Sequence, residues 1–116
     1  MTLRVTTSTV EPDIVVLHLS GSMTISPETD ALESLVRDLL SRSSRRLVFD
    51  LAGLYEIEAD AALFLVRCFF TVRAAGGKLR FAAAKPDVAR PFKRTMLDTL
   101  LPFDTTLAAA CEYFTI

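Results

Sequence analysis

The sequence predicts a small α/β fold in which a mixed β-sheet, made of an N-terminal hairpin and parallel strands, packs against about four helices. Three observations support this fold class. Two β-rich segments flank a turn near the N-terminus, strand and helix patterns then alternate along the chain, and Gly or Pro marks several of the boundaries. With 116 residues, 51% of them hydrophobic, the chain is expected to form one domain over residues 1–116 around a single core.

The first two predicted strands are Leu3–Thr9, in which apolar and polar residues alternate, and Ile14–Leu19, which is rich in aliphatic residues. The Glu-Pro-Asp sequence between them has the composition of a turn. The two strands are therefore expected to form a hairpin.

The first helix is expected to begin at Ser26, a favourable N-cap residue, with Pro27 in its first turn. An apolar stripe at helical spacing extends to Leu40, which predicts a helix as far as about Arg42. The next strand, Leu47–Leu51, is nearly all apolar, as is typical of a parallel strand covered on both faces.

The second helix is predicted from about Asp60 to Ala75, where Gly76 and Gly77 give a strong stop signal. Leu79–Ala83 is rich in apolar residues and is predicted to form the following strand.

Two further helices are expected in the C-terminal part. The first opens at Pro86, extends to Leu97 and is irregular near Pro91, since proline lacks the N–H that a helix interior requires. A Leu-Pro-Phe break then precedes a short last helix that Thr105 or Thr106 can cap.

Composition and charge exclude two classes of function. The net charge of −1 and the pI near 5.8 give no electrostatic footprint for nucleic acid. No stretch approaches the roughly 20 apolar residues that span a bilayer, and the N-terminus lacks a signal-peptide pattern. We therefore expect a cytoplasmic protein without membrane insertion.

Cys68 and Cys111 both fall within apolar helical patterns and are expected to be buried free thiols. His18 is the only histidine, which we take to exclude both a His-based metal site and a Ser-His-Asp triad. The carboxylates of Glu56 and its neighbours alternate around a predicted turn and are not expected to converge on a cation. The sequence thus predicts no metal site, no cofactor and no catalytic activity.

Functional residues are expected where the parallel strands end, because α/β sheets bind their ligands at the carboxyl ends of the strands. Two loops reach that edge, Ser20–Ser26 and Ala52–Asp60. Asp50, just before the second loop, is expected to accept hydrogen bonds from turn N–H groups. Asp60 is expected to cap the second helix or to complement its dipole, and both roles are compatible with contact to a partner.

The second helix also predicts a binding surface when its residues are placed at about 100° per position. An apolar face that includes Leu65 is expected to pack on the sheet, whereas Asp60, Phe64 and Arg67 fall on the opposite face, with Leu63 beside them. Aromatic residues and Arg are common anchors of protein interfaces, so this face is a candidate docking surface. Alternatively, another helix or a homodimer mate covers it.

The order of these elements, with the segments SGSMTIS, LVFDLAGLYEIEADAALFLV and RAAGGKLRFAAAKPDV, resembles the STAS domain and, within that group, the bacterial anti-sigma-factor antagonists. The resemblance runs from about Val5 to Phe114. Members usually carry Asp-Ser-Ser-Gly at the start of the second helix, and a partner anti-sigma factor that is also a kinase phosphorylates the second serine. This chain has Glu58-Ala59-Asp60-Ala61 there, so a carboxylate stands where the family has its phosphate acceptor.

The resemblance implies a non-catalytic regulator of transcription that binds an anti-sigma factor of the histidine-kinase-like ATPase type in a partner-switching pathway. The surface implied for this contact comprises Ser22, Thr24, Ser26, Glu58, Ala59, Asp60, Leu63, Phe64 and Arg67. Asp60 either mimics phosphoserine and holds a weak-binding state, or faces a partner that has adapted to it with a basic residue. A homodimer also remains open.

Two other functions are compatible with a STAS domain. The chain is either a subunit that regulates a lipid-transport ABC ATPase or a sensor of a nucleotide or other small molecule at the same strand-to-helix junction.

Overall fold

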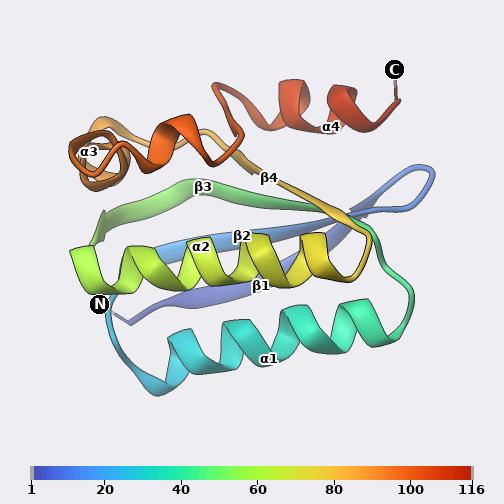
Figure 1. The fold of residues 1–116 in the computed structure, drawn as a ribbon, viewed down its shortest axis with the longest axis horizontal. Helices are drawn as coiled ribbons and strands as arrows, with labels where there is room; N and C mark the ends of the chain where they lie inside the picture. The colour runs from blue at the N-terminus through green and yellow to red at the C-terminus, as the bar shows by residue number, and fades with distance from the viewer. Residues whose placement is uncertain (1, 116) are drawn as a thin grey trace.

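The computed structural model describes residues 2–115 and contains one five-stranded mixed sheet (Figure 1). The strands lie in the order of the sequence: β1 (Arg4–Val10), β2 (Ile14–Met23), β3 (Arg46–Ile57), β4 (Lys78–Ala82) and β5 (Phe103–Asp104). The first pair is antiparallel and the others are parallel, so the predicted N-terminal hairpin is confirmed.

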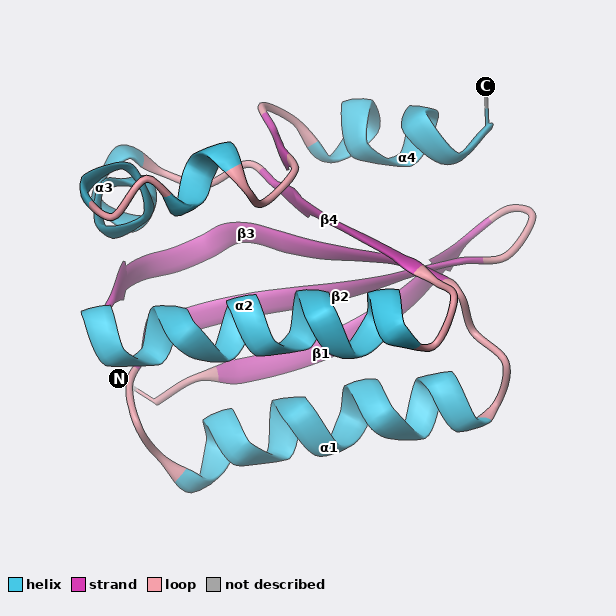
Figure 2. Cartoon of the chain, in the orientation of Figure 1, coloured by secondary structure: helices cyan, strands magenta, loops and turns pink. Residues whose placement is uncertain are grey.

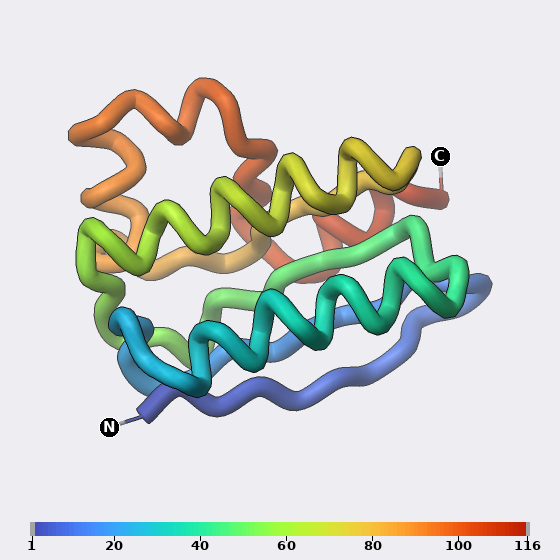
Figure 3. Tube along the Cα trace, turned by 60° about the horizontal axis from the view of Figure 1, so that its bottom comes forward, coloured from blue at the N-terminus to red at the C-terminus, as the bar shows by residue number. Residues whose placement is uncertain are grey.

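The helices are α1 (Pro27–Ser41), α2 (Ala59–Ala74), α3 (Pro86–Arg94) and α4 (Leu107–Thr115). Helices α1 and α2 lie side by side over one face of the sheet, and α4 lies behind the opposite face (Figure 3). Both α1 and α2 connect neighbouring parallel strands, so each begins at the carboxyl end of a strand. The predicted fold class is confirmed.

The core has two parts, one on each face of the sheet. The larger one lies under α1, α2 and α3 and contains an aromatic row across the strands, formed by Phe49, Phe81, Phe103 and Phe92 with successive ring centroids 5.6, 5.3 and 5.1 Å apart. The smaller one includes Val16 and Val48 of the sheet and Phe114 of α4. Strands β2 and β3 are therefore covered on both faces over much of their length.

Strands β2 and β3 run further than the sequence predicted. Strand β2 continues to Met23 and β3 to Ile57, so most of the two expected loops, Ser20–Ser26 and Ala52–Asp60, is strand, and that expectation is wrong. Strands β2 and β3 remain paired because their register shifts between His18 and Ser20 and again after Gly21. These shifts accommodate the irregular backbone of the two strands. A Cβ on Gly53 would lie 2.9 Å from the carbonyl oxygen of Leu19, so glycine permits the close approach of the two strands.

The C-terminal part differs in two details, and Figure 2 shows its alternation of loop and short elements. Helix α3 ends at Arg94 instead of Leu97, because Met96 has a φ of 60° and the chain then enters a short 3₁₀ turn. The Leu-Pro-Phe segment that we predicted as a break includes the start of β5. Thr106 caps α4 as expected, since its Oγ1 accepts a hydrogen bond of 3.1 Å from the N–H of Ala109.

Cys68 is a buried free thiol, as predicted, and burial raises its pKa to about 12. Cys111 is also a free thiol, but it is only half-buried and not buried as expected, because only one face of α4 packs on the sheet. Within residues 2–115, none of the helices has the length and apolar character needed to cross a membrane.

Candidate functional site

The carboxyl ends of β2 and β3 meet at the start of α2, as the sequence predicted. Met23 and Ile57 are cross-strand partners, and the N–H of Glu58 donates a hydrogen bond of 3.0 Å to the carbonyl of Met23. This bond joins the segment that leads into α1 to the first residues of α2 (Figure 1). We call this edge the junction.

The polar residues of the first predicted loop hold the junction together. Ser26 caps α1, since its Oγ accepts from the N–H of Thr29 at 3.3 Å, and the buried hydroxyl of Thr29 donates to the carbonyl of Thr24. Ser22 lies in β2, not in a loop, and its hydroxyl donates to Glu56 Oε1 at 3.2 Å. These residues fix the shape of the rim, and Ser22, Thr24 and Ser26 are each half-buried.

Asp60 is exposed in the first turn of α2 but does not cap it. The N-cap is Glu58, whose backbone is extended and whose side chain makes no capping hydrogen bond. The expectation that Asp60 caps the helix is therefore wrong, because the helix begins one residue earlier than predicted. Its second expected role stands, since a carboxylate in the first turn complements the helix dipole.

Phe64 is not part of the exposed face of α2. Its side chain is only 8% exposed and belongs to the core under α1 and α2. The guanidinium of Arg67 lies 4.9 Å from the centre of its ring, and the same guanidinium forms an ion pair of 3.0 Å with the buried Glu33 of α1. The predicted exposure of Phe64 is wrong because α1 packs against this side of α2.

Three exposed apolar side chains occur at the junction instead. Ile25 and Tyr55 are each 58% exposed, and Leu63 is 54% exposed, as predicted for that residue. The Lys85 ammonium lies 4.5 Å from the centre of the Tyr55 ring. The exposure of Ile25 and Tyr55 could not be predicted from the sequence, because both residues were expected in loops. Without a helix or strand periodicity, the sequence does not indicate whether a side chain faces the core or the solvent.

The junction is acidic. Glu56, Glu58 and Asp60 are exposed around the start of α2, and Glu28 and Asp30 occupy the first turn of α1. Two helix starts therefore attract carboxylates to one edge of the molecule. Among the described residues, no group of three or more His, Cys, Asp or Glu side chains is placed to hold a metal ion.

A hydrogen-bonded Ser-His-Asp row is present, although we took the single histidine to exclude one. His18 Nδ1 lies 2.7 Å from Asp50 Oδ2, and its Nε2 lies 2.8 Å from Ser8 Oγ. One histidine suffices for such a row, so the exclusion was wrong. The N–H of Ala52 donates to Asp50 Oδ1 at 3.1 Å, which confirms that Asp50 accepts from a nearby backbone group.

This row crosses an open sheet surface. Ser8 is exposed on the edge strand β1, whereas triad chemistry takes place in a cavity that holds substrate beside oxyanion donors. The row connects β1, β2 and β3 by side-chain hydrogen bonds, and we assign it that structural role.

Comparisons with known proteins give the same fold. The chain superposes on a candidate anti-sigma factor antagonist from Thermotoga maritima with a TM-score of 0.84 and 19% identity, covering 94% of this chain and 92% of that one. An anti-sigma factor antagonist from Mycobacterium paratuberculosis gives a TM-score of 0.83 and 21% identity, with coverages of 97% and 93%. The unphosphorylated anti-sigma factor antagonist SpoIIAA gives 0.79 and 13%, with coverages of 97% and 98%.

No curated protein sequence matches the chain. A family model does, and its description is STAS domain. Because that model matches residues 6–110, which is most of the sequence, the chain belongs to the STAS domain family.

Proposed function

We propose that this STAS domain is a non-catalytic regulator that binds an anti-sigma factor of the histidine-kinase-like ATPase type through the junction. The observation that carries the proposal is that Asp60 is exposed in the first turn of α2. By the resemblance stated from the sequence, this is the position at which the antagonists carry their phosphorylated serine. The antagonist SpoIIAA is known in unphosphorylated and phosphorylated forms, and both have the fold of this chain.

The proposed contact surface keeps most of the predicted residues and changes its apolar part. Asp60, Glu58, Ala59, Leu63 and Arg67 present exposed side chains along α2 and its start. Ser22, Thr24 and Ser26 form the rim, and Ile25 and Tyr55 replace Phe64 as apolar anchors. Exposed aromatic and aliphatic side chains beside charged ones are a common composition of docking surfaces.

The charge of the junction indicates what the partner presents. Its exposed carboxylates favour a basic contact surface, because complementary potentials steer association and select partners. Phosphoserine would add about −1.5 to −2 charges and could be removed, whereas Asp60 contributes one charge permanently. The proposed domain therefore binds its partner without a phosphorylation switch at this position.

Capture of the partner tests the proposal. Immobilised wild-type domain is expected to retain a histidine-kinase-like ATPase from the source cell's lysate, identified by mass spectrometry. The variant Asp60→Lys/Leu63→Ser should retain less than about a tenth as much, because it reverses a charge and removes an apolar anchor at the centre of the surface.

A matched control uses the tip of the β1–β2 hairpin, at the other end of the molecule (Figure 1). There the variant Glu11→Lys/Val10→Ser makes the same chemical changes at two exposed residues and should capture as much as wild type. Equal loss in both variants, or equal retention in both, would contradict the junction as the docking site. Recovery of transporter ATPase subunits instead would replace the proposal by the lipid-transport function.

A further inference from the structure

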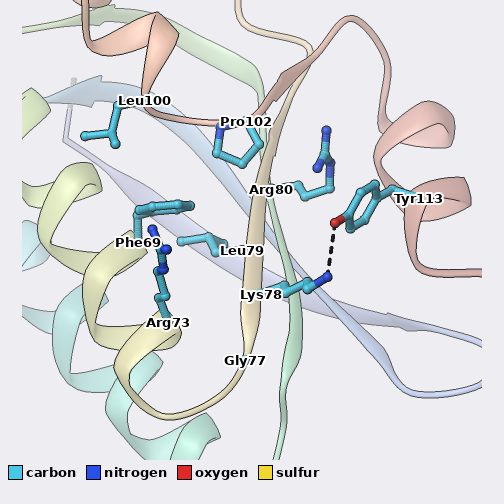
Figure 4. Close-up of a pocket in the computed structure, with 9 residues that line it drawn as sticks. All are labelled: Phe69, Arg73, Gly77, Lys78, Leu79, Arg80, Leu100, Pro102 and Tyr113. Atoms are coloured by element: carbon cyan, nitrogen blue, oxygen red, sulfur yellow. Dashed lines mark hydrogen bonds between the residues drawn. The ribbon is translucent and has the colours of Figure 1, made fainter.

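A cavity of about 360 Å³ lies far from the junction, at the other end of α2. Figure 4 shows it along β4, between the last turns of α2 on one side and Tyr113 of α4 on the other. Its walls differ in chemistry. Phe69, Leu79, Leu100 and Pro102 are apolar, and Arg73, Lys78 and Arg80 are cationic. The volume falls within the range of about 300–1,000 Å³ that is typical of small-molecule sites.

The cavity concentrates positive charge in a chain whose net charge is −1. A second cavity shares Lys78 and Tyr113 with the first and adds Arg45 and Arg46, so that five of the chain's 13 Lys and Arg residues line the two. No Asp or Glu among the described residues lines either cavity.

Two of the three cations that line the first cavity have no carboxylate partner. Arg80 forms a bidentate pair with Asp104, at 2.6 and 3.1 Å. Within residues 2–115, neither Arg73 nor Lys78 lies within ion-pair distance of an acid. Lys78 Nζ instead donates a hydrogen bond of 3.2 Å to the hydroxyl of Tyr113, and this contact lowers the pKa of the tyrosine. The two free charges flank the apolar wall.

A helix dipole accounts for only one of these two charges. Arg73 in the last turn of α2 complements the helix dipole, but Lys78 lies on a strand, where dipoles are small. Lys78 is also the direct cross-strand partner of Arg46, a second cation, whose guanidinium lies 3.4 Å from Asp13. A bound anion would give Lys78 the counter-charge that the described residues do not supply.

The edge of β4 adds a backbone donor. Strand β5 pairs only with Phe81 and Ala82, so the preceding residues of β4 have an open edge beside the cavity. The N–H of Lys78 bonds to Arg45 on the β3 side, and the N–H of Phe81 bonds to Pro102 on the other. Since successive N–H groups of a strand alternate in direction, that of Leu79 faces the open edge.

From these features we infer that the cavity binds a small amphipathic anion, a carboxylate with a hydrocarbon chain. The carboxylate lies between Arg73, Lys78 and the N–H of Leu79, and the chain lies against Phe69 and Leu100. This site is distinct from the junction, and its ligand is distinct from the partner proposed there.

Titration with decanoate, below its micelle concentration, tests the inference. Decanoate should shift the amide NMR signals of residues 77–80 and 113 in a saturable manner. Two partial probes, acetate with the charge alone and decanol with the chain alone, should each bind at least about tenfold more weakly. Acetate binding as tightly as decanoate would indicate an adventitious ion only and would overturn the inference.

Matched variants locate the site. Arg73→Gln/Lys78→Gln removes the two unpaired cations and should weaken decanoate binding at least about tenfold, whereas Lys85→Gln/Arg94→Gln removes two exposed cations elsewhere and should not. In the same way, Leu100→Ser should weaken binding and Leu63→Ser should leave it unchanged. All six positions are exposed outside the core, so the variants are expected to fold, and thermal unfolding checks this. Unchanged affinity in Arg73→Gln/Lys78→Gln would contradict the site.

Discussion

Replacing Phe81 with alanine is expected to lower the free energy of unfolding by about 3–5 kcal/mol, the usual cost of removing a fully buried aromatic side chain. Phe81 is completely buried, and its ring stands between Phe49 and Phe103 in the aromatic row across the sheet. The substitution would leave a cavity where three strands meet. Urea unfolding followed by circular dichroism measures the change.

Phe70→Ala is the control for this prediction. Phe70 is 45% exposed and touches the edge of Phe69 on the outside of α2. Its removal should cost less than about 1 kcal/mol, because little apolar area returns to water. Similar losses in the two variants would mean that the aromatic row is not the centre of the core.

Gly21→Ala is expected to lower the free energy of unfolding by about 2–5 kcal/mol, the sum of backbone strain and overpacking. Gly21 has a φ of +89°, which alanine adopts only with strain, and an added Cβ would lie 2.2 Å from the carbonyl oxygen of Thr2. Either β2 must straighten or the N-terminal segment must move away.

Gly76→Ala separates the two contributions. Gly76 has a similar φ of +83°, but an added Cβ would meet nothing within 4 Å. Its replacement should therefore cost only the strain, about 1–2 kcal/mol. If Gly21→Ala cost no more than Gly76→Ala in the same urea unfolding experiment, the close contact with Thr2 would be disproved.

The order and type of the elements could be predicted because local signals mark them. Ser26 with Pro27 started α1 and the two glycines after Ala75 stopped α2, and both act through their immediate neighbours. The lengths of β2 and β3 could not be predicted in this way. Their continuation through Ser-Gly-Ser and Ala-Gly depends on bulges and on a close approach between two strands that are distant in sequence.

The candidate site also has features that could be predicted from the sequence and features that could not. The edge that carries Asp60 follows from the rule that parallel strands end together, so the sequence located it correctly. The direction of Phe64 depended on where α1 packs, and a helical wheel for α2 contains no information on that neighbour. Glu33 of α1 binds Arg67 over the Phe64 ring, and only the tertiary structure brings these three residues together.

The cluster of cations around the two cavities could not be predicted from the sequence for a related reason. Its cations come from the start of β3 and the residue before it, from the end of α2 and from strand β4, and no local run of sequence contains them. The crossover connections place these segments at the amino-terminal edge of the sheet. The result is an acidic junction at one end of the molecule and a cationic, partly apolar cavity at the other.

The most direct test of the proposed function asks whether the position of Asp60 faces the partner's kinase site. The captured ATPase is incubated with Mg²⁺ and ATP together with wild type, Asp60→Ser or Asp60→Ala, and phosphate is located by peptide mass spectrometry. The proposal predicts phosphate on the new serine alone, with wild type and Asp60→Ala unmodified. An Asp60→Ser domain that binds the ATPase but stays unphosphorylated, or a wild type modified to the same extent, would contradict it.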